Sequence, residues 1–145
     1  MKVLIVDDLF TKQIQAVKAL NDFDVVDFDT AECVMEGLLN LESKDYDLII
    51  IDMGLPIRRG EPVQNEREGF RLLQELVNEE VFVPTIVFSS TDLGQEKIDY
   101  LKEAGYPFLG QAFDDAELRE HLQNFILSEK EFDQQKNNYL EKSKS

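Results

Sequence analysis

One stretch, Asp47 to Pro56, constrains the fold most, because a short apolar run ends there abruptly on a carboxylate. Residues 48–51 read Leu-Ile-Ile-Ile, Asp52 follows them directly, and Gly54 lies two positions further on. A mostly β-branched run of this length without polar alternation predicts a strand buried on both faces, as in a parallel sheet. Asp52 is then expected at the carboxyl end of a central strand, which is where open α/β sheets bind ligands.

A second acidic position has the same context. Lys2 to Val6 is another apolar strand-like run, and it ends on Asp7 and Asp8. If the two strands are neighbours in a parallel sheet, the three carboxylates meet in one crevice at the sheet edge.

Strand-like and helical segments alternate along the whole chain. Strands are expected at 2–6, 25–28, 48–51, 84–88 and around 108–109. Apolar residues recur every three or four positions between them, which predicts amphipathic helices. The first helix is expected to bury Phe10, Ile14, Val17 and Leu20, and Asp29 with Glu32 is expected to cap the start of the second.

This alternation predicts a single α/β domain, a parallel sheet with helices on both faces. Right-handed crossovers leave the flavodoxin-like, five-stranded order 2-1-3-4-5 as the obvious topology, and it places the first and third strands side by side. The segment after Pro56 is polar up to Gly69 and is expected to form a long surface loop.

Composition narrows the function classes. The 145 residues suit one domain, and a net charge of -15 disfavours nucleic acid and anionic membranes as direct partners. We expect a cytoplasmic protein, because the N-terminus has no signal-peptide pattern and no apolar run is long enough to span a bilayer. The single cysteine, Cys33, is expected to be a buried core thiol rather than a reactive one.

Three clustered carboxylates cannot all remain ionised unless a cation neutralises them. Oxygen ligands without nearby Cys or His suit Mg²⁺, and a divalent ion there would hold a phosphoryl donor against Asp52 for in-line attack. The product would be an aspartyl phosphate. The alternative is that Asp7, Asp8 and Asp52 are only solvated or cap the helices that follow.

Over roughly residues 1–128 the chain resembles the response-regulator receiver domains (CheY-like) of two-component phosphorelay signalling. The matching residues are the acidic pair, Asp52 with Pro56 four residues later, Ser89 after an apolar strand, and Phe108. The resemblance implies phosphorylation of Asp52 and Mg²⁺ binding by Asp8, Asp52 and the carbonyl of Gly54, with Asp7 contributing through water. It also implies that Ser89 hydrogen-bonds the phosphoryl group and that Phe108 is the aromatic side chain that rotates in response. The phosphoryl group would come from a histidine kinase or phosphotransfer protein.

The chain departs from that family at one charged position. Receivers carry a lysine at the end of the fifth strand, where this sequence has Gln111, and no lysine occurs between Lys102 and Lys130. A neutral hydrogen bond contributes roughly 0.5 to 1.5 kcal/mol and one to a charged group roughly 1.5 to 3. The response to phosphate should therefore weaken about tenfold or more, unless another cation substitutes.

The arginines offer such a substitute. Four of the five fall between Pro56 and Leu72, and either Arg58 or Arg59 could contact the phosphoryl group. The alternative is that these arginines, Arg67 and Arg71 included, only offset an acidic surface or dock on an acidic partner.

Residues 129–145 are expected to extend the last helix beyond the receiver domain of residues 1–128. Phe125, Phe132 and Tyr139 recur every seven residues, which favours a homodimer or a groove-docking helix, and a frayed tail is the alternative.

Together these features predict a stand-alone receiver that is not an enzyme and signals to a downstream protein partner. The main alternative is a pseudo-receiver, an interaction module that phosphate does not switch because Gln111 replaces the lysine. An aspartyl-phosphate phosphatase is disfavoured, because that class needs a second Asp where Gly54 stands.

Overall fold

Five strands and five helices alternate in the computed structural model, which describes residues 1–63 and 68–144. The strands are β1 (Lys2–Val6), β2 (Asp27–Ala31), β3 (Leu48–Ile51), β4 (Thr85–Phe88) and β5 (Phe108–Ala112). The helices are α1 (Phe10–Asp22), α2 (Val34–Ser43), α3 (Phe70–Asn78), α4 (Gln95–Glu103) and α5 (Asp115–Lys144).

The sheet is parallel and its order is β2-β1-β3-β4-β5, so the predicted fold class and strand order are confirmed. The pairing of β1 with β3 places Val6 opposite Ile51. All residues of β3 and β4 are buried, which explains why neither strand alternates with polar residues. Since Val6 and Ile51 are the last residues of their strands, the acidic residues that follow lie at the same edge of the sheet.

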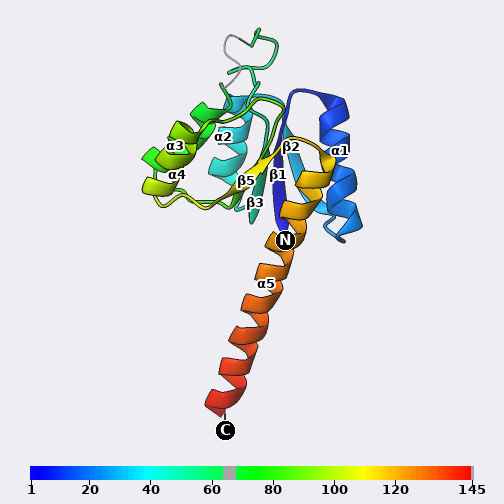
Figure 1. Ribbon diagram of the computed structural model, residues 1–145, viewed down its shortest axis with the longest axis vertical. Coiled ribbons are helices and arrows are strands. Elements are labelled where there is room, and N and C mark those ends of the chain that lie inside the picture. The colour runs from blue at the N-terminus through cyan, green and yellow to red at the C-terminus, as the bar shows by residue number, and fades with distance from the viewer. Residues whose placement is uncertain (64–67, 145) are drawn as a thin grey trace.

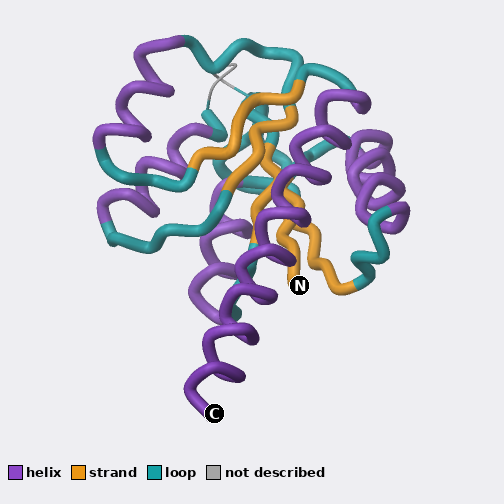
Figure 2. Tube along the Cα trace, turned by 60° about the horizontal axis from the view of Figure 1, so that its bottom comes forward, coloured by secondary structure: helices purple, strands orange, loops and turns teal. Residues whose placement is uncertain are grey.

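Helices cover both faces of the sheet. Figure 1 shows α1 and α5 on one side and α2, α3 and α4 on the other, and Figure 2 shows the strands enclosed between them from a second direction. Each face has its own apolar cluster: Leu20, Ile50 and Leu122 belong to the first, and Ile49, Leu72 and Leu101 to the second.

The predicted inner face of α1 is wrong for its first turns. Phe10 is 72% exposed and Ile14 is 36% exposed, whereas Gln13 is buried with the two alanines of the helix. The amide of Gln13 donates a hydrogen bond to the carbonyl of Asp7 (2.6 Å), which satisfies this buried polar group.

The start of the second strand and the cap of the second helix also differ from the prediction. The second strand begins at Asp27, because Val25 still belongs to the turn after α1 and donates its N–H to the carbonyl of Leu20. Cys33, rather than Asp29, caps α2: its Sγ accepts the N–H of Glu36 at 3.4 Å. Cys33 is buried, as predicted.

The loop after β3 packs on the start of α2. The carbonyl of Pro56 accepts the N–H of Val34, and the carbonyl of Ile57 accepts that of Met35. These bonds occupy N–H groups of the first helical turn that have no partner within the helix. These hydrogen bonds therefore fix the chain shortly after Asp52. Arg67, further along the same loop, lies outside the described residues.

The last helix extends far beyond the body of the domain (Figure 1). It has 30 residues, which corresponds to about 45 Å. Its first part packs on the sheet through buried Leu118 and Leu122, whereas Phe132 and Tyr139 are 63% and 73% exposed. Within the described ranges, no helix combines the length and apolarity that crossing a bilayer requires.

Candidate phosphorylation site

Asp7, Asp8 and Asp52 come together at the carboxyl edge of the sheet, as the strand order requires. One carboxylate oxygen from each lies within 4.8 Å of the others. Asp7 and Asp52 are buried at 3% and 8% exposure, while Asp8 is more open to solvent. The predicted convergence of the three carboxylates is therefore confirmed.

Burial dominates the electrostatics of Asp7. It raises the pKa of this carboxyl to about 6, and the negative charge of Asp52 adds to the effect. The N–H of Leu9, which donates to Asp7 at 2.9 Å, and the ammonium of Lys12 oppose it. Burial and the charge of Asp52 also raise the pKa of Asp8. Such shifts are typical of carboxylates that need a cation.

Asp52 is held from two sides. Its Oδ1 accepts the N–H of Met53 at 2.9 Å and lies 3.2 Å from the Nζ of Lys12. Behind it, Gly69 approaches so closely that a Cβ there would collide with the carbonyl oxygen of Asp52 and lie 3.0 Å from the Cα of Met53. The N–H of Gly69 also donates to the carbonyl of Met53 at 2.8 Å, so the start of α3 supports this segment.

Lys12 is a site residue that the sequence analysis missed. It lies in the first turn of α1, and its Nζ reaches Asp52, Asp7 (3.4 Å) and the carbonyl of Phe88 (2.9 Å). The helical period of the segment identified only its apolar residues. The available signal was a lysine four residues after an acidic pair, on a helix that starts at the sheet edge.

Gln111 lies at the end of β5, and its amide binds the loop between β4 and α4. The Nε2 donates to the carbonyls of Thr91 (2.6 Å) and Ser89 (3.3 Å), and the Oε1 accepts the N–H of Leu93 (2.9 Å). The side chain thereby joins the last strand to this loop.

The other predicted switch residues lie at the expected strand ends. Ser89 is buried directly after β4, and its Oγ accepts the N–H of Thr91 at 3.2 Å. Phe108 is the first residue of β5 and packs, half-buried, against the core. Gly54 follows Asp52 on the loop after β3.

Arg59 lies on the loop after β3, and its side chain reaches Glu36 of α2 rather than the three carboxylates. Its Nε lies 2.6 Å from Glu36 and its guanidinium also pairs with Glu32 at 3.4 Å. The hydrogen bond from Arg59 lowers the pKa of Glu36 to about 2. Arg58 lines a hollow of the same loop with Glu61. Among the described ion pairs, Lys12 supplies the cation beside Asp52.

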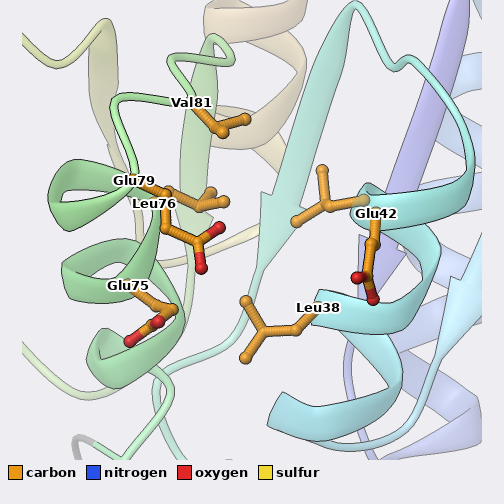
Figure 3. Close-up of a pocket in the computed structure, with 7 residues that line it drawn as sticks. Leu38, Glu42, Glu75, Leu76, Glu79 and Val81 are labelled. Carbon is orange, nitrogen blue, oxygen red and sulfur yellow. The ribbon is translucent and has the colours of Figure 1, made fainter.

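A separate pocket lies between α2 and α3, away from the carboxylates. Figure 3 shows Leu38 and Glu42 facing Glu75, Leu76 and Glu79 across it. Its lining combines apolar side chains with three glutamates, and among the described residues these glutamates form no carboxylate cluster like the one at the sheet edge.

The fold and the carboxylate cluster agree with the comparison to known families. The sequence model of the response regulator receiver domain matches residues 3–123, and the chain belongs to this family. Receivers are generally signalling modules of two-component systems, with an acidic pocket that typically binds Mg²⁺. The donor set of Asp7, Asp8 and Asp52 fits that ion, because all three offer hard carboxylate oxygens.

The transcriptional regulatory protein CiaR of Streptococcus pneumoniae is 28% identical over 127 residues, which are 87% of this chain and 51% of that protein. The chain thus spans about half the length of this curated relative. The receiver domain of the Francisella response regulator 1452 is 28% identical (TM-score 0.61; 86% of this chain and 94% of that one). The chemotaxis response regulator CheY4 of Vibrio cholerae, at 23% identity, shares the fold (TM-score 0.62; 86% and 97% covered).

Proposed function

We propose that this protein is a phosphorylation-dependent receiver in which Asp52 accepts the phosphoryl group. The observation that carries the proposal is the convergence of three carboxylates within 4.8 Å at the ends of two adjacent strands. Asp7, Asp8 and Asp52, with the carbonyl of Gly54, would hold Mg²⁺. When bound, this ion would offset the carboxylate charge and orient the oxygens of the donor.

The residues of the chain account for the remaining chemistry. A carboxylate oxygen of Asp52 attacks phosphorus, and the bond between phosphorus and the donor breaks with its electron pair leaving on the donor. The Oδ1 of Asp52 already receives the N–H of Met53, which favours attack by the other oxygen. The hydroxyl of Ser89 would then donate to a phosphoryl oxygen. No proton is taken from Asp52, because its carboxylate attacks in the ionised form.

The donor would be a histidine kinase or a phosphotransfer protein, and the output would be binding of a downstream protein. The output face would be the one formed by β4, α4, β5 and α5, because Phe108 and Gln111 belong to β5 and Ser89 directly follows β4. A change at the phosphoryl group would reach this face through the loop that Gln111 holds.

The alternative function is a pseudo-receiver that binds partners without being switched. The hydrogen bonds of Gln111 favour it, because an amide engaged with the β4–α4 loop is not available to the phosphoryl group. Both functions share the fold and the acidic pocket, so phosphorylation itself distinguishes them.

The experiment is intact-mass analysis after incubation with a small phosphodonor and Mg²⁺. The wild type should gain one phosphoryl group, and Asp52→Asn should gain none. Failure of the wild type to gain it with several donors, while Mg²⁺ still binds by calorimetry, would replace the proposal with the pseudo-receiver.

We also propose that residues 129–145 form an interaction helix outside the receiver domain of residues 1–128. Exposed Phe132 and Tyr139 lie two helical turns apart, which supports pairing with a second copy of the chain. Light scattering over a range of concentrations should show a dimer for the full chain and a monomer after removal of residues 129–145. A monomer in both cases would refute pairing.

A further inference from the structure

The ammonium of Lys12 has three oxygen neighbours within the site. It donates to the carbonyl of Phe88 at 2.9 Å and lies 3.2 Å from Asp52 and 3.4 Å from Asp7. One of these contacts is a hydrogen bond and the other two are ion pairs with buried carboxylates. The side chain is only 21% exposed, and its charge also lies 4.9 Å from the ring centre of Phe88.

The ammonium of Lys12 lies at the end of the sheet that a lysine on β5 would also reach. Phe88 is the last residue of β4 and pairs with Ala112, which directly follows Gln111. An ammonium bound to the carbonyl of Phe88 therefore lies where β4 and β5 end together. Gln111 itself is committed to the β4–α4 loop.

We infer that Lys12, on α1, is the phosphate-binding cation of this receiver and replaces the lysine that β5 lacks. The inference rests on the proposed phosphorylation of Asp52. The carbonyl of Phe88 holds the ammonium 3.2 Å from Asp52, where it can pair with a phosphoryl oxygen on that residue. Phosphate recognition is thereby supplied by the first helix instead of the last strand.

The position of Lys12 also affects the binding of Mg²⁺ at this site. Lys12 contacts two of the three carboxylates that would hold Mg²⁺, so its charge opposes a divalent ion when no phosphoryl group is present. Once a phosphoryl group adds negative charge, the ammonium and the metal ion share it. Removal of Lys12 should therefore strengthen the binding of Mg²⁺ alone and weaken that of the phosphoryl mimic.

The test compares wild type with Lys12→Met, which keeps an unbranched chain over Phe88, and with Lys18→Met as a matched control. Lys18 is on the same helix and exposed. Calorimetric titrations use Mg²⁺ alone, and then beryllofluoride at saturating Mg²⁺. Lys12→Met should bind beryllofluoride about 10- to 100-fold more weakly and Mg²⁺ several-fold more tightly. Lys18→Met should match the wild type, and Lys12→Arg should bind beryllofluoride better than Lys12→Met does.

The outcomes separate the two claims. Wild-type affinity for beryllofluoride in Lys12→Met would overturn the role of Lys12 and leave the phosphorylation of Asp52 intact. No beryllofluoride binding by the wild type at saturating Mg²⁺ would overturn both. Parallel loss of Mg²⁺ and beryllofluoride binding in Lys12→Met would show a structural role instead, because only charge removal changes the two affinities in opposite directions.

Discussion

Replacing Asp7 with Asn should stabilise the protein at neutral pH in the absence of divalent ions. Asp7 is 3% exposed, and burial raises its pKa from 3.8 to about 6 although Lys12 lies 3.4 Å away. The cost of burying the ionised carboxyl therefore exceeds the gain from its cationic partner. Asn removes the charge and keeps an oxygen that can accept the N–H of Leu9.

The sign and size of this stability difference follow from proton linkage. Between about pH 4 and pH 6 the folded protein retains a proton on Asp7 that the unfolded chain has released, so stability falls as pH rises through this window. A shift of about two units corresponds to about 3 kcal/mol. Asp7→Asn should be more stable than wild type by up to about this amount at pH 7, and by little at pH 4.

Urea unfolding at a series of pH values between 4 and 7.5, with chelator present, measures this difference. Asp24→Asn is the control, because Asp24 is exposed and its positive φ of 63° is one that Asn tolerates. A stability difference between Asp7→Asn and wild type that does not change with pH would refute the reasoning. Excess Mg²⁺ should reverse the order of stabilities, because it stabilises wild type more.

Three other substitutions test contacts of the site and of the sheet that carries it. Gly69→Ala should destabilise the fold by about 1 to 3 kcal/mol, because the new Cβ collides with the backbone of Asp52; unchanged urea unfolding would contradict this. Gln111→Ala should speed amide hydrogen exchange in residues 89–94, and wild-type exchange there would show that its hydrogen bonds do not hold the loop. Thr85→Val should lower the free energy of unfolding by about 1 to 3 kcal/mol, because the buried hydroxyl of Tyr106 loses a 2.8 Å hydrogen bond. A calorimetric melting temperature equal to that of the wild type would contradict this prediction.

The central strands and the acidic cluster could be predicted because they depend on local sequence. Buried parallel strands need uninterrupted apolar runs, and the bounds of β1 and β3 match the predicted ones. Since the strand order follows from connection rules, the meeting of Asp7, Asp8 and Asp52 followed from the sequence alone.

The remaining differences arise from contacts between segments far apart in the chain. Lys12 was not singled out as a site residue, because its partners Asp52 and Phe88 lie 40 and 76 residues away in the sequence. The burial of Gln13 likewise depends on a contact outside the helical pattern, in which the carbonyl of Asp7 accepts its amide N–H. Arg59 was a candidate phosphate contact by proximity in sequence, and its ion pair with Glu36 became apparent only in the folded structure.

The most direct test of the account locates the phosphoryl group itself. After treatment with a phosphodonor and Mg²⁺, borohydride reduces an aspartyl phosphate to homoserine, and peptide mass spectrometry identifies the converted residue. The account predicts homoserine at position 52 alone, in wild type and not without Mg²⁺. Conversion at Asp7 or Asp8, or none anywhere in a chain that still binds Mg²⁺, would contradict it.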